Sequence, residues 1–572
     1  MADAKVDVEK AASLPPSSPG TDGLTDKEHD QEAMGFEPIR TRNTAGRPGS
    51  KAGSGRRASV SRTLSRTRSQ NGYSCDDYPG DHSDEDTAAA GSPGDRTPED
   101  KDPFEVGFDG GNADPMCPRS MGTARKWLIV SIVSGASFCV TAASSIYTST
   151  YAQMDAEFHS SRIVSTLGLS TFVLGISLGP MFLGPLSEFF GRRPIYLVSW
   201  SAYLIWIVPQ AVARNVATMI VSRFFDGLAG SAFLAVSGGT VSDLFTRQDL
   251  QGPMLLYSLA PFIGPAVGPA VGGFINYNAN WRWTYYFLLI WTFLQFLMIV
   301  FFVPETYHPI ILRDKAKKKR KETGDDRWKA PMEKTDKSIL NTIGISLMRP
   351  FQLLIFEPMV LLLCIFSAIL LGILYLFFGA FPLVFRNTHG FNLWQVGLSF
   401  LGIMVGLLLA AAADPIFHGI RDRLTARLER ETGIPGSSEP EFRLPPAICG
   451  AFLVTIGIFI FGWTSFAHVH WIAPIIGSSI FGAGTLLVFT GIFTFLVDAY
   501  PLYAASALAA NAFVRCLFAA AFPLFGNQMY DKLGYQWASS LLGFLTLLML
   551  PFPYLFFRYG KRIRGHSRYA TD

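Results

Sequence analysis

Charged residues are scarce in this chain. Asp, Glu, Lys and Arg make up 16% of its 572 residues, against roughly 25% in an ordinary soluble domain. The scarcity is also uneven, because residues 1–125 hold 22 of the 45 acidic and 16 of the 49 basic residues. The other 447 residues carry a net formal charge of +10. This composition excludes a soluble globular protein and a nucleic-acid binder as descriptions of the whole chain.

The sequence also lacks the spacings that mark metal and catalytic sites. Its six cysteines are scattered, with no CxxC pair and no Cys/His cluster at ligand spacing, so neither zinc nor a disulfide framework is indicated. No HExxH motif and no GxxxxGK[ST] phosphate-binding loop occurs. We therefore expect no catalytic residue, no metal and no ATP hydrolysis, and a membrane-bound enzyme or receptor is disfavoured.

Residues 1–125 are rich in Ser, Gly, Pro, Asp and Arg and poor in apolar residues. Such a segment buries too little apolar surface to offset the entropy of ordering, so we predict a disordered tail. A basic block, Arg40 to Arg68, precedes an acidic block, Asp76 to Asp114. The basic block is either an electrostatic switch on an anionic membrane surface, released by phosphorylation, or a solvated linker. Its candidate phosphorylation sites are Ser59, Ser65 and Ser69.

Long apolar stretches begin after Trp127. Each is about 20 residues long, the length that a helix needs to cross about 30 Å of hydrocarbon. They lie near residues 127–149, 164–184, 194–213, 216–238, 253–275, 283–303, 357–384, 392–413, 446–466, 472–497, 506–526 and 537–557. Continuous rather than alternating apolarity excludes a transmembrane β-barrel. The sequence thus predicts an all-α membrane protein with twelve transmembrane helices in two six-helix halves.

The predicted organisation has five parts: a cytoplasmic tail (1–125), a first half (126–303), a central cytoplasmic loop (304–356), a second half (357–557) and a cytoplasmic C-terminal tail (558–572). Basic residues gather at alternate ends of the stretches, and the positive-inside rule places those ends in the cytoplasm. The basic groups are Arg125 and Lys126, Arg192 and Arg193, Arg247, Lys315 to Arg320, Arg421 to Arg430, and Arg558 to Arg564. Two repeated halves are typical of secondary transporters, whose substrate binds between them.

The loop between the second and third stretches carries paired arginines, in Gly184-Pro-Leu-Ser-Glu188-Phe-Phe-Gly191-Arg192-Arg193. A carboxylate at a helix end and two guanidinium groups are able to bridge helices in one conformation and release them in another. The alternative interpretation is that the arginines only fix the topology.

Two charges lie inside the fourth stretch, Arg223 and Asp226. A charge in the apolar core costs a few kcal/mol and needs a partner or a water-filled cavity. Because the two residues are three apart on a helix, we expect Asp226 to be the partner of Arg223. The pair is the candidate proton-coupling site, and a permanent structural ion pair is the alternative.

The fifth stretch combines glycine and proline at short intervals. These residues permit kinks and close helix approach in a membrane. The candidate gating residues here are Pro261, Gly264, Pro265, Gly268, Gly272 and Gly273. Arg515, in the eleventh stretch, is a further intramembrane charge with no acid nearby in sequence. It binds backbone carbonyls, a substrate anion or the Arg223 region.

These motifs together resemble those of the major facilitator superfamily, specifically the fungal twelve-span drug:proton antiporters of the polyamine and multidrug exporter branch. The loop resembles G-x-L-x-D-R-x-G-R-R, with Glu188 in place of Asp and Phe189 in place of the first Arg. The segment from Arg223 to Gly227 resembles R-x-x-x-G, and the fifth stretch resembles the exporter signature G-x-x-x-G-P-x-x-G-G. The resemblance covers residues 127–557. It implies the major facilitator fold, proton coupling at Arg223 and export.

The expected function is proton-coupled export of lipophilic drugs, toxins or endogenous metabolites by alternating access. Asp226 is the only acid near the middle of the spans, with Asp414 and Asp498 at their ends. Because polycations need carboxylates to replace their hydration, this inventory favours bulky neutral or weakly anionic lipophiles. A polyamine exporter of the same family and a gradient-driven facilitator without proton coupling remain as alternatives.

The expected partners are a small lipophilic substrate, protons and the lipid bilayer, with the proton gradient in place of a cofactor. The family default is the plasma membrane, and the positive-inside rule places both termini of this multi-pass protein in the cytoplasm. We expect it to function as a monomer. The vacuolar membrane is the open alternative.

Overall fold

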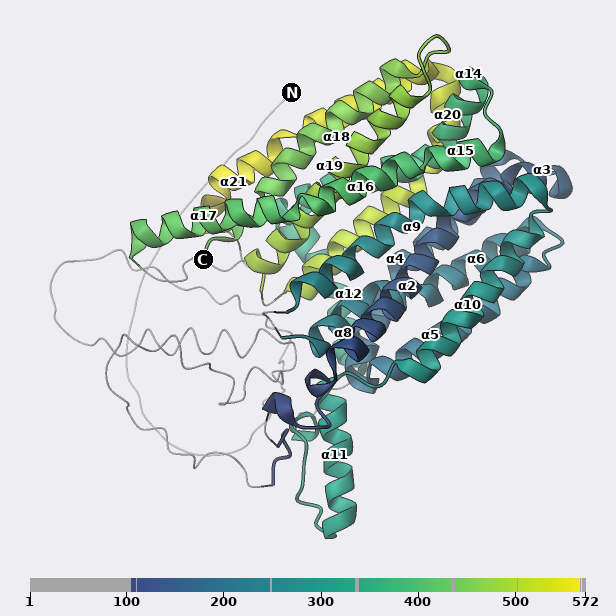
Figure 1. Cartoon of the computed structure of the whole chain (residues 1–572). Helices are drawn as coiled ribbons and strands as arrows, with labels where there is room; N and C mark the ends of the chain where they lie inside the picture. Colours follow the sequence, from purple (N-terminus) through teal and green to yellow (C-terminus); the bar gives the residue numbers. More distant parts are fainter. Residues whose placement is uncertain are drawn as a thin grey trace, which may run out of the picture. The chain divides into compact units, whose positions relative to one another are not determined.

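The computed structural model describes residues 104–109, 111–246, 249–334, 339–433, 438–501, 503–565 and 567. Helices dominate these ranges, and no strand occurs in them beyond one isolated bridge between Glu105 and Lys329 (Figure 1). The candidate phosphorylation sites Ser59, Ser65 and Ser69, and Arg247 of the basic groups, lie outside the described residues.

The first half is a bundle of long apolar helices. Its elements are α2 (Thr123–Ile146), η5 (Tyr147–Thr150), α3 (Tyr151–Phe158), α4 (Arg162–Phe190), α5 (Arg192–Ala211), α6 (Val216–Gly230), α7 (Ala232–Ala235), α8 (Ser237–Leu244), α9 (Gln251–Asn278) and α10 (Arg282–Phe302). The η5 and α3 segments continue α2, and α6 to α8 form one interrupted helix.

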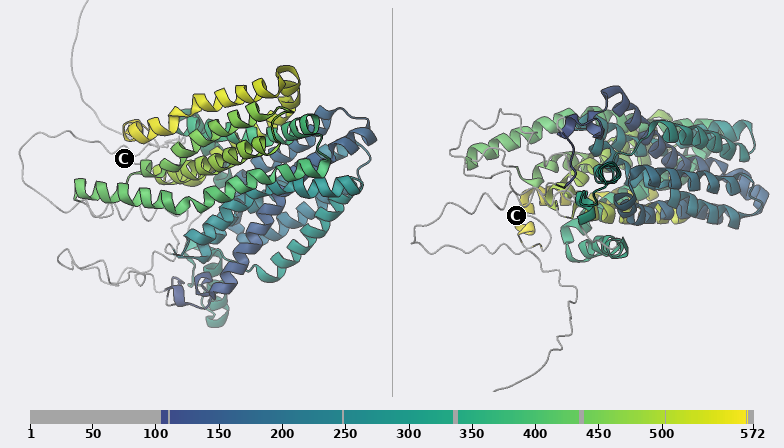
Figure 2. Two further views of the ribbon diagram at one scale, coloured as in Figure 1. Left: turned by 45° about the horizontal axis from the view of Figure 1, so that its top comes forward. Right: turned by 90° about the horizontal axis from the view of Figure 1, so that it is seen from below.

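The connection between the halves contains α11 (His308–Thr323), η6 (Pro331–Lys334) and α12 (Ile339–Phe356). The second half is built like the first. Its elements are α13 (Pro358–Phe381), η7 (Pro382–Arg386), α14 (Asn387–His389), α15 (Leu393–Ser399), α16 (Leu401–Ala412), α17 (Asp414–Thr432), η8 (Pro440–Arg443), α18 (Pro445–Thr464), α19 (Ile472–Ala499), α20 (Ala504–Met549) and α21 (Pro551–Arg564). The long helices run side by side in both views of Figure 2.

Ten helical segments of the described chain are long and apolar enough to cross a membrane. One of them contains α20, in which Gly534 adopts φ 76° and ψ 164° and divides two helices. That backbone conformation favours glycine, which has no Cβ. In addition, α5 is a 20-residue helix that is less apolar than the ten. Counting α5 and both parts of α20 gives the twelve helices that the sequence predicts.

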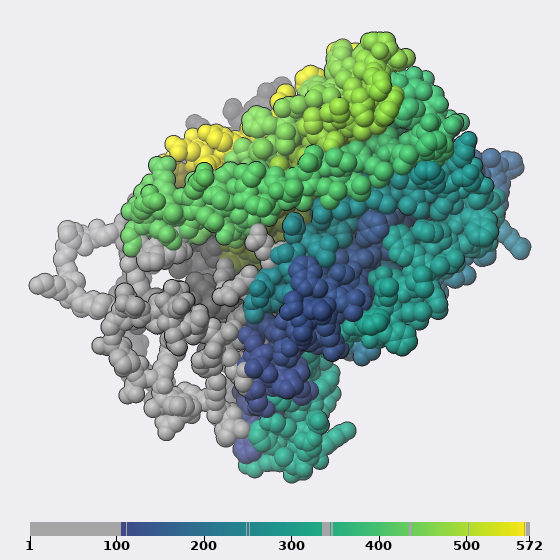
Figure 3. Space-filling view, viewed as in Figure 1, coloured from purple at the N-terminus to yellow at the C-terminus, as the bar shows by residue number. Residues whose placement is uncertain are grey.

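Small residues let neighbouring helices approach closely. A Cβ on Gly450 would lie 2.5 Å from the carbonyl oxygen of Gly484, so α18 and α19 pack backbone against backbone. The two halves pack against each other in Figure 3, the first in purple to teal and the second in green to yellow. At this interface the hydroxyl of Ser170 donates to the carbonyl of Ala520 at 2.6 Å.

The structure differs from the predicted organisation before α2. Residues 104–109 and 111–121, here called the docked segment, fall within the predicted disordered tail, yet they pack on the central connection. Val106, Phe108 and Cys117 are buried against residues of α11. The segment has these apolar residues and a buried Asp114, which the average composition of the tail conceals. The end of the chain differs similarly, because α21 runs to Arg564 across the predicted boundary at 557.

Candidate functional site

Arg223 is fully buried in α6, within the first half. Its guanidinium donates to the carbonyls of Ala143 at 3.1 Å, Ser144 at 3.4 Å and Gly168 at 3.4 Å. It also lies 4.3 Å from the ring centroids of Tyr147 and Phe172. Carbonyl dipoles and aromatic faces thus replace water around this charge, since each is attracted to a cation.

Asp226 forms no direct ion pair with Arg223, so the expected pairing is wrong, although the two charges interact electrostatically. Its Oδ2 atom accepts a hydrogen bond of 2.9 Å from Gln210 of α5, while Oδ1 is buried without a partner. Three residues advance a helix by about 300°, which leaves the two side chains about 60° apart. Arg223 therefore reaches α2 and α4, and Asp226 reaches α5. Both are buried, but they belong to separate contacts of α6.

Ser144 extends the surroundings of Arg223 to the second half. The carbonyl of Ser144 accepts from Arg223, and its hydroxyl lies 3.0 Å from the hydroxyl of Tyr375 in α13. The coupling candidate therefore lies two contacts from the other half of the bundle. Proteins transmit conformational change through such contiguous contacts.

In the loop of residues 184–193, Arg192 at the start of α5 makes the contacts to other helices. Its guanidinium donates to Asp243 of α8 at 3.3 Å and to the hydroxyl of Ser187 at 2.6 Å, and it lies 4.6 Å from the ring centroid of Tyr307. The predicted carboxylate, Glu188, interacts with Arg192 electrostatically. Sequence analysis did not predict Asp243 as the ion-pair partner of Arg192. The position of this acid at the same end of the fourth span would have indicated the pairing.

Glycine shapes this loop at one position. Gly191 has φ 99°, which allows the chain to turn between α4 and α5. Gly184, by contrast, lies within α4, and a Cβ there would meet no atom within 4 Å. Of the two loop glycines named in the sequence, Gly191 therefore makes the turn.

Glu305 is a second residue that sequence analysis missed here. Its carboxylate accepts from the backbone N–H groups of Arg192 at 2.9 Å and Arg193 at 3.1 Å. A carboxylate at this place satisfies unpaired donors and complements the positive end of the helix dipole. Arg193 also donates to the carbonyl of Val300 in α10 at 3.2 Å. The sixth span is thereby fastened to the start of the third.

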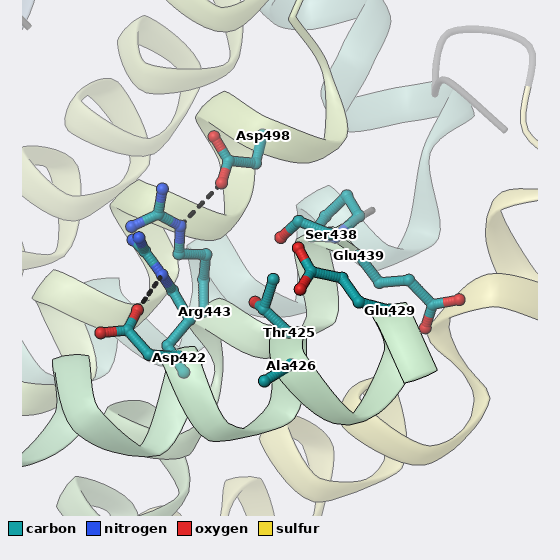
Figure 4. A pocket seen from close by; sticks show the side chains of 10 residues that line it. Asp422, Thr425, Ala426, Glu429, Ser438, Glu439, Arg443 and Asp498 are labelled. Carbon is teal, nitrogen blue, oxygen red and sulfur yellow. Dashed lines mark hydrogen bonds and ion pairs between the residues drawn. The ribbon is translucent and has the colours of Figure 1, made fainter. Parts of the chain in front are cut away.

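The second half carries a matching ion pair. Arg443, just before α18, donates to Asp498 near the end of α19 at 2.7 Å (Figure 4). Arg192 and Asp243 occupy the same places in the first half, at the start of its third span and the end of its fourth. Two residues before Arg443, Glu441 pairs with the buried Arg564 of α21 at 2.9 Å. Both halves thus close the same end with an arginine and a carboxylate.

A polar hollow of about 540 Å³ adjoins this pair. Figure 4 shows its side chains, which come from α17, η8, α19 and the segment before η8. Four carboxylates and two arginines line it, and Arg421 pairs with Asp422 at 3.8 Å. A charged lining of this kind does not suit a lipophilic molecule.

The glycines of α9 seat this helix on α2. A Cβ on Gly264 would lie 2.8 Å from the backbone nitrogen of Ala142, and one on Gly268 would lie 2.7 Å from the carbonyl oxygen of Ala142. Gly272 faces Ile146 in the same way. Gly273 instead faces the carbonyl of Leu393, at the start of α15 in the second half. Pro261 and Pro265 lie inside α9, Pro261 just before this packed region and Pro265 between Gly264 and Gly268.

Arg515 lies in α20 among aromatic rings. Its guanidinium carbon is 5.2 Å from the ring centroid of Phe489, 5.0 Å from that of Phe493 and 6.0 Å from that of Phe262. The Nε and Nη1 atoms are buried without a hydrogen-bond partner. Arg515 therefore lies at the interface of the two halves. In the part of the chain that the structure describes, no group of His, Cys, Asp and Glu residues is arranged to hold a metal ion.

Comparison with known proteins identifies the family to which this architecture belongs. The family model described as Major Facilitator Superfamily matches residues 133–523. The chain is 56% identical over 473 residues to efflux pump atB of Aspergillus terreus, covering 83% of this chain and 91% of that protein. It is 42% identical over 475 residues to the probable drug/proton antiporter YHK8 of Saccharomyces cerevisiae, covering 82% and 91%.

A crystal structure of a D-xylose–proton symporter shares the fold, with a TM-score of 0.54 and 15% identity over 75% of this chain and 97% of that one. The relatives are named as pumps and antiporters, not as enzymes. The chain belongs to the major facilitator superfamily, with fungal efflux pumps and drug/proton antiporters among its relatives.

Proposed function

We propose that this protein exports lipophilic drugs, toxins or endogenous metabolites across a membrane by alternating access, in exchange for protons. The observation that carries the proposal is the packing of α9. Its glycines hold α2 of the first half, while Gly273 contacts α15 of the second. A helix that contacts both halves at small residues suits a transporter whose halves move against each other. The names of the relatives support export.

Proton coupling is assigned to the surroundings of Arg223 and Asp226. Asp226 is a buried carboxylate with one unpartnered oxygen, and a buried acid binds and releases a proton when its surroundings change. No cofactor is required, because the proton gradient supplies the energy. Lipid and a small lipophile are the other partners, and the protein functions as a monomer.

A polyamine exporter is less well supported. Asp226 accepts from Gln210 within the first half and does not face the second half. The contact between the halves beside Arg515 is instead aromatic, with Phe262 of α9 stacked on Phe489 of α19. Polycations need carboxylates in place of their hydration shell, so lipophiles fit this interface better.

The proposed location is the plasma membrane, with both chain ends in the cytoplasm. The support comes from the basic residues of the Arg192 loop, α11 and α17, which the positive-inside rule assigns to one face. A fluorescent fusion at the C-terminus, imaged against plasma and vacuolar membrane markers, tests it. Fluorescence confined to the vacuolar membrane would reject the location.

Expression in an efflux-deficient yeast tests the function. We expect resistance to azoles, cycloheximide or aromatic fungal metabolites and loss of substrate efflux when an ionophore dissipates the proton gradient. Efflux that persists without the gradient would instead identify a facilitator. Resistance to polyamines alone would reject the argument from the carboxylates.

A further inference from the structure

Arg515 is a half-buried cation for which the described part of the chain provides no counter-ion. Its Nε and Nη1 atoms have no hydrogen-bond partner. The ionisable side chains that interact with it most strongly are Cys516, Tyr375, Cys364 and Tyr257, and none of them is a carboxylic acid. A guanidinium group stays protonated in proteins, so the positive charge remains.

Other buried or half-buried arginines of the chain are provided with partners. Arg192 pairs with Asp243, Arg443 with Asp498 and Arg564 with Glu441. Arg223, which also lacks an ion pair, donates to three carbonyls. Leaving a buried charge without such partners is costly. It would therefore be unusual for Arg515 to remain permanently without a counter-ion or hydrogen-bond acceptor.

The position of Arg515 suits a ligand that both halves touch. Phe262 comes from α9 of the first half, and Phe489 and Phe493 come from α19 of the second. Phe489 stacks on Phe262 with centroids 5.1 Å apart and on Phe493 with centroids 5.8 Å apart. A guanidinium beside aromatic rings keeps the N–H donors in its own plane available for an oxyanion.

We propose that Arg515 is the counter-ion for the carboxylate of an aromatic lipophilic substrate. The inference rests on the proposed export function and names the chemical class of the exported compound. The carboxylate accepts from the guanidinium group of Arg515, and the apolar remainder packs on Phe262, Phe489 and Phe493. Substrate binding thus neutralises a charge that the empty protein leaves unpaired.

Binding of two probes of equal size tests the proposal. We choose 1-naphthylacetate and its neutral amide, 1-naphthylacetamide, and titrate each into the purified full-length protein in detergent by calorimetry. Charge-assisted hydrogen bonds predict that wild type prefers the carboxylate by about tenfold or more. Arg515→Met removes this preference, and Arg515→Lys keeps part of it. Lys532→Gln, which removes an exposed cation of the same helix, leaves it unchanged.

A preference that survives in Arg515→Met would overturn the proposal, as would equal binding of both probes to wild type. A second measurement distinguishes a ligand-binding arginine from a structural one. Removing an unpaired, half-buried charge raises the thermal unfolding midpoint of the empty protein, so we expect Arg515→Met to raise it. Arg223→Met, which leaves carbonyls without donors, lowers it. A lower midpoint or loss of folding in Arg515→Met would assign a structural role and reject the inference.

These outcomes are separable from those for the export function. Proton-driven efflux of neutral lipophiles without carboxylate preference would reject only the role of Arg515. Carboxylate binding through Arg515 without any dependence of efflux on the proton gradient would reject only proton coupling.

Discussion

Arg223 and Asp226 are three residues apart in α6, and they contact different neighbouring helices, α2 and α4 for Arg223 and α5 for Asp226. Arg223 depends on the carbonyls of Ala143, Ser144 and Gly168, whereas Asp226 depends on the amide of Gln210. The sequence correctly indicates that both charges are intramembrane. It does not indicate their partners, because carbonyls on other helices leave no signature in residue type.

Replacing Arg223 with Lys tests the carbonyl cluster. A single ammonium group lacks the planar fork that reaches several acceptors, so buried carbonyls lose donors at about 1–3 kcal/mol each. We expect Arg223→Lys to lower the thermal unfolding midpoint and to reduce proton-driven transport at least about 10-fold. Transport in proteoliposomes and unfolding in detergent measure the two effects. Unchanged transport would show that the fork is dispensable.

Replacing Asp226 with Asn tests the proton-carrier hypothesis. The amide is close in size to the carboxylate and keeps an oxygen that accepts from Gln210, but it binds no proton. We expect the folded protein to persist while transport loses its dependence on pH, measured as initial efflux rates across a pH series. Asp249→Asn, at an exposed loop position, is the matched control. The hypothesis fails if Asp226→Asn transports with the pH dependence of wild type.

Among elements, α9 shows how a sequence motif becomes a helix interface. The repeated glycines and prolines predict close packing in the fifth span, and the structure places that packing on α2 at Gly264 and Gly268. The motif does not reveal that Gly273 faces the other half. Which helix a glycine faces depends on the rotation of α9 within the bundle, and that rotation is set by contacts far away in sequence.

Gly268→Ala tests this interface against an open glycine. The added Cβ would lie 2.7 Å from the carbonyl oxygen of Ala142, so α9 has to shift, at a cost of about 1–3 kcal/mol. We expect a lower unfolding midpoint and transport reduced several-fold. Gly184→Ala is the control, because its Cβ meets no atom within 4 Å and alanine favours a helix by about 1 kcal/mol. Equal behaviour of the two variants would contradict the assignment.

At the scale of the whole molecule, the number and length of the apolar stretches predict the twelve helices and the two halves. It does not predict the ion pairs that close one end of each half. Arg192 and Asp243 are 51 residues apart, and Arg443 and Asp498 are 55 apart. The two partners of each pair come from consecutive spans, and only the folded bundle brings them together.

The docked segment is likewise beyond sequence prediction, because its partners lie about 200 residues away. Lys315 of α11 donates to Asp114 at 2.6 Å and to the carbonyl of Gly107 at 3.0 Å, and pairs with Asp109 at 2.8 Å. Burial pushes the pKa of Asp114 upward, but the hydrogen bonds from Lys315 and two backbone N–H groups outweigh it and hold the pKa below its ordinary 3.8. Burial lowers the pKa of Lys315, but Asp109 and Asp114 raise it above 10.5.

The pH dependence of docking follows from these directions. The contribution of Asp114 is complete above its unfolded pKa and is lost as pH falls through its lower folded pKa. That of Lys315 is complete below its unfolded pKa and is lost as pH rises through its higher folded pKa. The docked segment is therefore held most strongly between about pH 4 and pH 10.

Lys315→Met tests docking at neutral pH. A buried carboxylate without its partner is destabilised, so we expect hydrogen exchange of residues 104–121 to accelerate by at least about 10-fold. Lys318→Met, on an exposed face of α11, serves as the control. Exchange rates that match in both variants would mean that apolar contacts alone hold the segment.

The docked segment also has a consequence for biosynthesis. Asp114 precedes Lys315 by 201 residues, and ribosomes add about 5–20 residues per second. Asp114 therefore leaves the ribosome about 10–40 s before its partner exists, while six spans are still entering the membrane. During that interval the apolar residues of the docked segment are available to chaperones and proteases. The segment packs on α11 only after the whole first half has been synthesised.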